Sequence, residues 1–310
     1  MIFRRRAVLA LCASVLAVLA ACTTAGTPTA AAPADPAAVP DEPFAAALTR
    51  FGGGVRGVVE FVDLRAVATG SGTWSQLVSG GRLGPYAQQL AERLRIDVLG
   101  ADWTATASAG GPLITLVAGG QDAAAIRTAA EAAGWTGADV LARDLAVAEP
   151  LTVQAATIRP IGADVVVGGA RAPVELVDGP GPALADDPQV AALRDCLGQG
   201  LAVVMLHRPE RGSAYAVGAA PAPDDPAGAV STVCATHETP AAATDRAAAV
   251  RADAAPGAAA PWGGALVDPQ VTELGGPANV VRLTGRNAAD RPPTFVVGQM
   301  SRQDLPGGIR

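Results

Sequence analysis

The sequence predicts an α+β fold made of two tandem pseudo-repeats, each with the element order β-α-β-β-α-β-β. Runs rich in valine, isoleucine and phenylalanine alternate along the chain with alanine-rich runs of helical period, a pattern that separates strands from helices. Residues 56–63 (RGVVEFVD) match residues 171–178 (RAPVELVD) at an offset of 115, and residues 162–166 match 277–281 at the same offset. Two matches at one spacing indicate a duplication. Chance similarity in a chain rich in alanine, valine and glycine is the alternative.

The first pseudo-repeat is expected to span residues 43–170. A helix is predicted after Pro85, because Ala87, Leu90 and Leu94 fall on one helical face. A second helix, residues 121–133, is capped by Asp122 and stopped by Gly134. Strands are predicted where residues of high strand propensity occur, or where apolar and polar residues alternate between turn residues. These strands are 57–63, 103–107, 113–117, 151–159 and 164–168.

The second pseudo-repeat is expected to span residues 171–300, followed by a C-terminal tail at 301–310. Asp187 and Pro188 predict a helix that runs to Leu197, and Asp225-Pro226 predicts the start of another that carries Cys234. Residues 240–264 read as a loop or a weak helix. Strands are predicted at 173–178, 201–206, 213–218, 266–273, 279–284 and 294–299. The first six elements of each repeat match a split β-α-β, ferredoxin-like order, so we expect antiparallel or mixed sheets with helices on one face.

The N-terminus has the three regions of a secretory signal. Arg4, Arg5 and Arg6 are followed by an apolar stretch at 7–20 and by Leu19-Ala20-Ala21-Cys22. The apolar stretch is shorter than the roughly 20 residues that span a bilayer. This segment resembles the lipobox of bacterial lipoproteins. The resemblance implies cleavage of residues 1–21, a diacylglycerol on the sulfur of Cys22, and usually a third acyl chain on its new amino group.

The export route is left open by the N-terminal segment, and composition predicts the character of the residues that follow it. Arg5 and Arg6 also fit a twin-arginine signal loosely, so both export routes remain possible. Residues 22–42 contain the lipidated cysteine and a run of alanine, proline and threonine, which predicts a disordered tether. The lysine-free, arginine- and alanine-rich composition resembles that of proteins from high-GC actinobacteria.

Charge and composition exclude several functions. Removal of residues 1–21, which contain three arginines and no acidic residue, moves the formal charge from −6 to −9. An acidic chain lacks the basic face that phosphate contacts require, so we expect no nucleic-acid partner. All 23 basic residues are arginine, which excludes Schiff-base lysines and phosphate-loop lysines.

Cysteine usage predicts one disulfide. Cys12 lies in the signal segment and Cys22 is the lipidation site, which leaves Cys196 and Cys234 as an even pair. An exported protein enters an oxidising compartment, where such a pair is expected to form a bridge. Two buried free thiols are the alternative.

No catalytic, cofactor or metal site is predicted, although three features resemble parts of such sites. Gly52–Gly57 satisfies G-x-G-x-x-G but precedes a strand, so the phosphate-binding geometry fails. His237 follows Cys234 by three residues, and with His207 it does not complete a four-ligand set. The carboxylates that recur in the internal match are a candidate paired site, with solvent-facing strand positions as the alternative; they are Glu60, Asp63, Glu175 and Asp178.

Three functions follow as expectations. The first is a membrane-anchored, extracytoplasmic lipoprotein with a non-catalytic binding or structural role, and with an envelope protein as its possible partner. The second is a small-ligand or lipid-binding receptor lipoprotein, and the third is an envelope enzyme. A pocket of several hundred Å³ with converging polar groups would favour the second or the third. Flat faces with an exposed apolar patch would favour the first.

Overall fold

The structure is a computed structural model that describes residues 42–69, 74, 81–108, 111–144, 149–259 and 261–310. The signal segment, Cys22 and the tether lie outside the described residues. Residues 40–310 form one compact unit, and the description below concerns that unit. None of the described helices has the length and apolar character that crossing a bilayer would require.

The described strands form a single antiparallel sheet, which confirms the α+β class. The strands are β1 (Gly57–Asp63), β2 (Trp103–Ser108), β3 (Leu113–Ala118), β4 (Leu141–Ala142), β5 (Thr157–Ile161), β6 (Asp164–Gly168), β7 (Val203–Arg208), β8 (Tyr215–Ala222), β9 (Asp225–Ala235), β10 (Leu266–Leu274) and β11 (Val280–Asn287). The α-helices are α1 (Pro43–Arg50), α2 (Leu64–Thr69), α3 (Ala87–Leu94), α4 (Ala123–Ala132), α5 (Pro150–Gln154), α6 (Pro188–Leu197), α7 (Pro240–Ala254) and α8 (Phe295–Ser301). Short 3₁₀ helices are η2 (Gly81–Tyr86), η3 (Val174–Leu176), η4 (Leu184–Asp186) and η5 (Pro306–Gly308).

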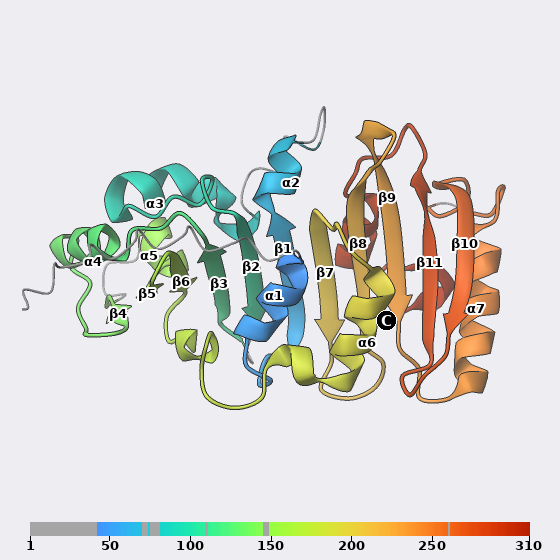
Figure 1. The fold of residues 1–310 in the computed structure, drawn as a ribbon, viewed down its shortest axis with the longest axis horizontal. Coiled ribbons are helices and arrows are strands. Elements are labelled where there is room, and N and C mark those ends of the chain that lie inside the picture. The colour runs from blue at the N-terminus through green and yellow to red at the C-terminus, as the bar shows by residue number, and fades with distance from the viewer. Residues whose placement is uncertain (1–41, 70–73, 75–80, 109–110, 145–148, 260) are drawn as a thin grey trace, which may run out of the picture. The chain divides into compact units, whose positions relative to one another are not determined.

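The order of the strands is mirrored about the central pair β1 and β7 (Figure 1). Outward from the centre it is β1-β2-β3-β6-β5 in one direction and β7-β8-β9-β11-β10 in the other, with β4 added beyond β5. In each half, three consecutive strands form a meander. The last strand of the half then returns beside the third strand of the meander, so that β6 pairs with β3 and β11 pairs with β9. Helix α4 leads from β3 towards the returning strands on one side, and α7 leads from β9 on the other.

Helices cover both faces of the sheet, so the prediction that they lie on one face is wrong. Phe61 belongs to the core beneath α1 and α6, whereas its neighbour Val62 packs into the cores on the opposite face. We call these the front face, towards the viewer in Figure 1, and the rear face. On the rear, α3, α4 and α5 pack over the first-half strands, and α7 and α8 over the second-half strands. Because successive strand residues point to opposite faces, a sheet with two apolar sets needs cover on both.

Strand β9 stands where a helix was predicted to begin at Asp225. Its backbone pairs with β8 on one side and β11 on the other. The Asp225 side chain accepts a hydrogen bond from the Ala227 N–H at the start of the hairpin. Asp225-Pro226 therefore marks a turn here and not a helix start. The segment is a strand because it pairs with distant strands, and no local pattern encodes such pairing.

Three predicted strands are also wrong. Residues 173–178 contain the 3₁₀ helix η3 in place of a strand. Residues 295–301 form α8, in which Val296 and Met300 are buried four positions apart, the spacing of a helical face. The strand predicted at 151–159 divides into α5 and β5, since Pro150 occupies the first turn of a helix.

The 115-residue offset does not align structurally equivalent residues. Residues 56–63 include β1, but residues 171–178 contain the 3₁₀ helix η3, and the central partner of β1 is β7. Residues 164–168 and 280–287 do form strands in mirrored positions. Even so, Val165 faces the rear core whereas Val280 faces the front core. A shift of one residue exchanges the two faces of a strand, so the offset does not pair equivalent positions.

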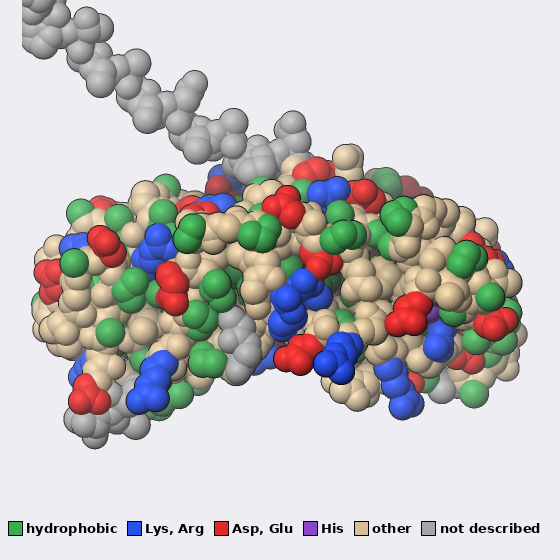
Figure 2. Space-filling view, turned by 90° about the horizontal axis from the view of Figure 1, so that it is seen from below, with side chains coloured by type: hydrophobic (Ala, Val, Ile, Leu, Met, Phe, Trp, Pro, Cys, Tyr) green, Lys and Arg blue, Asp and Glu red, His purple; other side chains and the backbone are tan. Residues whose placement is uncertain are grey.

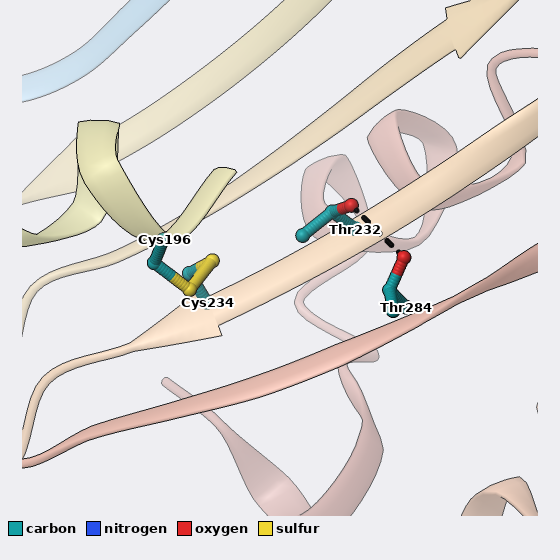
Figure 3. The surroundings of a disulfide bond; sticks show 4 residues. All are labelled: Cys196, Thr232, Cys234 and Thr284. Atoms are coloured by element: carbon teal, nitrogen blue, oxygen red, sulfur yellow. Dashed lines mark hydrogen bonds between the residues drawn. A yellow bond between two sulfur atoms is a disulfide. The ribbon is translucent and has the colours of Figure 1, made fainter. Parts of the chain in front are cut away.

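The predicted Cys196–Cys234 disulfide is present, with Cα atoms 6.2 Å apart. Figure 3 shows Cys196 at the end of α6 reaching Cys234 on β9. The bridge therefore joins a helix to the sheet, where a link between two helices was expected. Both cysteines are buried in the front core. Beside the bridge, the Thr232 and Thr284 hydroxyls lie 3.3 Å apart and tie β9 to β11 (Figure 3).

The last ten residues pack against the folded unit and do not form a free tail. Leu305 and Ile309 are buried beside α7 and α8. The indole N–H of Trp262 donates a hydrogen bond to the carbonyl of Asp304 at 2.8 Å.

Candidate functional site

A groove lies on the rear face where β1 pairs with β7, between α8 and η2. We call it the junction groove, since the two mirrored halves of the sheet meet there. It has two adjoining compartments that share Glu60 and Met205. The polar compartment has a volume of about 300 Å³ and the apolar one about 170 Å³. Both are half-open and lined by residues from the two halves of the chain.

Strand register sets the floor of the groove. Glu60 of β1 lies opposite Met205 of β7, and Val58 lies opposite His207. These side chains alternate with the front-core residues, so the pleat directs them to the rear. Helix α8 contacts β7 and β8 and closes one side with Val297 and Met300.

The other side of the groove is closed by Arg82 of η2. Its Nε and Nη2 donate hydrogen bonds to the two carboxylate oxygens of Glu60 at 3.2 and 3.1 Å. This is a bidentate pair, the geometry that a planar guanidinium favours. The Arg82 side chain is 50% exposed and that of Glu60 24%, so the pair lies at the rim.

An aromatic pair closes the end of the polar compartment. His207 and Tyr215 lie opposite each other on β7 and β8, and their ring centroids are 4.8 Å apart. Burial lowers the pKa of His207 and raises the pKa of Tyr215, so both rings are uncharged near neutral pH. The Nδ1 atom of His207 is buried and lacks a hydrogen-bond partner among the described residues.

The groove has the composition of a binding site more than that of a reaction centre. The Ser301 hydroxyl donates to the carbonyl of Val297 at 3.0 Å, so it is not held by a base as a nucleophile would be. Within the described residues there is no group of three or more histidine, cysteine or acidic side chains that could hold a metal ion. A polar patch beside an apolar one instead suits recognition of a molecule with both characters.

The carboxylates weighed as a paired site are not brought together. Glu60 is paired with Arg82, whereas Glu175 is exposed on η3. Asp63 accepts a hydrogen bond from the Ala66 N–H at the start of α2, and burial is the main cause of its raised pKa. Asp178 is paired with Arg50.

The remaining candidates have separate roles. His207 lines the junction groove, but His237 lies beyond the end of β9, where it lines a different pocket with Arg246. The Gly52 and Gly53 N–H groups bond to the carbonyls of Leu176 and Pro182, so this glycine-rich segment joins two chain segments.

No sequence pattern pointed to Arg82, Tyr215 or α8 as parts of a site. Their meeting depends on the pairing of β1 with β7, two strands separated by 139 residues between Asp63 and Val203. Local periodicity carries no information about such a pairing. His207 was the one groove residue that composition alone singled out, because the chain has two histidines.

Comparisons with known proteins leave the family open. No family model matches the chain, and no curated protein matches it. Two crystal structures of TP0453, in crystal forms IV and III, are similar to it with TM-scores of 0.43 and 0.41, each at 9% identity. They cover 83% and 82% of this chain, and 98% and 97% of their own. A likeness of this degree carries no conclusion about the function of this chain.

Proposed function

We propose that the chain is an extracytoplasmic lipoprotein, held at the cell membrane by the lipid on Cys22, with a non-catalytic binding role in the cell envelope. The observation that carries the proposal is Leu19-Ala20-Ala21-Cys22 behind a basic and then apolar N-terminus. Two or three acyl chains give stable anchoring without a membrane-spanning helix. The tether of residues 23–42 then spaces the folded unit from the bilayer by roughly 25 Å.

The disulfide supports this location. Structural disulfides persist in oxidising compartments outside the cytoplasm. The Cys196–Cys234 bridge is buried in the front core, as expected for a structural bond. The actinobacterial origin suggested by composition remains part of the proposal.

The surface supports binding of a small ligand over docking on an apolar patch. The large hydrophobic side chains that are strongly exposed in the described residues are Leu99, Val153 and Val267, which lie on separate elements or loops. On the face drawn in Figure 2, hydrophobic side chains are scattered among acidic and basic ones. The junction groove, with polar groups converging on a volume of about 300 Å³, favours the receptor form of the proposal. An envelope protein partner remains the alternative.

We also propose that the two halves, residues 43–170 and 171–300, arose by duplication. The mirrored strand order supports this, with β1 to β3 corresponding to β7 to β9, and with α4 corresponding to α7. In this correspondence α1 and α6 each precede the central strand of their half. The chain contains insertions of unequal length, so no single offset aligns it.

Metabolic labelling with a fatty acid tests the anchor. The wild-type chain should incorporate label, and Cys22→Ser should not, because serine lacks the sulfur that accepts the diacylglycerol. Cys12→Ser is the matched control, since it removes the other cysteine of the N-terminal segment and should remain labelled. Label on the Cys22→Ser variant would overturn the proposal.

A further inference from the structure

The junction groove carries no unbalanced charge. Arg82 and Glu60 neutralise each other through two hydrogen bonds. His207 and Tyr215 are kept uncharged by burial, which lowers the first pKa and raises the second. A ligand with a charged head meets no unpaired opposite charge there, so its charge gains little in the groove beyond its hydration in water.

The polar compartment nevertheless offers both kinds of hydrogen-bonding group. A guanidinium only donates and a carboxylate only accepts, and the two lie side by side at the rim. The imidazole of His207, which lines the same compartment, adds a ring that carries one donor and one acceptor nitrogen in its uncharged form. Hydroxyl groups, which donate and accept at once, match this set.

The adjoining compartment is apolar. Its lining includes Val62, Val203 and Val297, and Met205 links it to the polar compartment. Methionine side chains adapt to irregular apolar ligands, and Met300 lies beside the polar compartment as well. The small volume, about 170 Å³, suits a short alkyl or similar group.

We propose that the junction groove binds a neutral amphiphile, with a hydroxyl-rich head against Glu60, Arg82 and His207 and a short apolar group against Val62, Val203 and Val297. This inference rests on the receptor form of the proposed function and names its ligand class. The head hydroxyls accept from Arg82 and donate to Glu60, which leaves the ion pair in place.

Methionine methyl groups give a direct test. The chain has three methionines, Met1, Met205 and Met300, and the last two both line the groove. The full chain, labelled with ¹³C in its methionine methyls and held in phosphatidylcholine nanodiscs, is titrated with hexyl glucoside, hexanoate, hexylammonium and glucose. Met205→Leu and Met300→Leu assign the two signals.

Hexyl glucoside should shift both methyl signals with saturation. The two charged probes, and glucose without an alkyl chain, should bind at least about tenfold more weakly, a difference of about 1.4 kcal/mol. Arg82→Gln should weaken glucoside binding at least about fivefold, and so should His207→Phe, which keeps a ring against Tyr215 but removes both ring nitrogens. Arg93→Gln, which removes an exposed ion pair with Glu149 outside the groove, should leave the affinity unchanged.

Each contrary result has a distinct meaning. Binding of hexanoate or hexylammonium as tight as that of the glucoside would overturn the neutral-head inference while leaving a small-ligand receptor. Methionine signals that no probe shifts would overturn both the neutral-head inference and the small-ligand receptor. Neither result bears on the Cys22 anchor, which fatty-acid labelling tests separately.

Discussion

Glu60 of β1 and Met205 of β7 lie directly opposite each other at the centre of the sheet. Each belongs to the first strand of its half, and outward from this pair the strands follow the same order in both directions. The same two residues are shared by both compartments of the junction groove. The boundary between the halves and the candidate binding site therefore coincide.

Phe61→Ala should strongly destabilise the folded unit. Phe61 is fully buried, and its ring centroid lies 5.4 Å from that of Phe44 and 5.9 Å from that of Trp103. Loss of a buried phenylalanine costs about 3–5 kcal/mol, because a cavity remains. Urea denaturation measures the loss. Leu176→Ala, at the position that the 115-residue match equates with Phe61, is the control and should cost less than about half as much, because Leu176 is partly exposed. Equal costs would contradict this packing.

Replacement of both Cys196 and Cys234 by alanine should lower the free energy of unfolding. The bridge closes a separation of 38 residues, for which the chain-entropy model gives about 4 kcal/mol. Thermal or urea unfolding of the variant, compared with the oxidised wild type, measures the difference. Wild-type protein unfolded in the presence of reductant should behave like the variant. Identical stability of oxidised and reduced protein would show that the bridge does not constrain the unfolded chain.

Arg50→Met should destabilise the contact between α1 and the segments that follow β5 and η3. The Arg50 guanidinium donates two hydrogen bonds to Asp178, at 2.5 and 2.6 Å, and one to Asp164 at 2.8 Å. The hydrogen bond to Asp178 is the main cause of the raised pKa of Arg50. Three charge-assisted bonds at a half-buried site predict a loss of about 1.5–3 kcal/mol in urea denaturation.

Arg194→Met is the matched control for Arg50. Its partner, Asp195, is the adjacent residue and is exposed, so the change should stay within about 0.5 kcal/mol. A similar effect of the two substitutions would refute the special role of Arg50.

The stability of the folded unit should fall as the pH decreases below about 6.5. Burial lowers the pKa of His207, and burial with the charge of Arg246 lowers that of His237. Below the ordinary histidine pKa of 6.5, the unfolded chain binds protons that the folded chain does not yet bind, so unfolding becomes more favourable. The loss ends once the pH passes below the folded-state pKa values.

Proton NMR of the two imidazole rings checks this directly, together with urea midpoints across the same pH range. His207→Gln should make the midpoint depend less on pH. Imidazole titrations centred at or above about 6.5 would contradict the effect of burial.

Much of the secondary structure could be predicted because its causes are local. The Val-rich run at 57–63 forms β1, and Asp122 and Asp187 accept hydrogen bonds from the first turns of α4 and α6 as expected of helix caps. The pairing of Cys196 with Cys234 could be predicted from the count of cysteines and from the expected export signal. These features depend on a few neighbouring residues or on composition.

Which distant segments meet depends on the tertiary structure. Asp225-Pro226 has the local signal of a helix start, yet β8 and β11 bond to both edges of the segment and make it a strand. Val280 and Val165 look equivalent in sequence but face opposite cores, because one residue of register exchanges the faces of a strand. The meeting of Arg82, Glu60, His207 and Met300 in one groove depends on β1 pairing with β7. The predicted export signal, the class of fold and the available side chains follow from composition and short-range pattern, whereas the groove exists only through backbone pairing over long sequence separations.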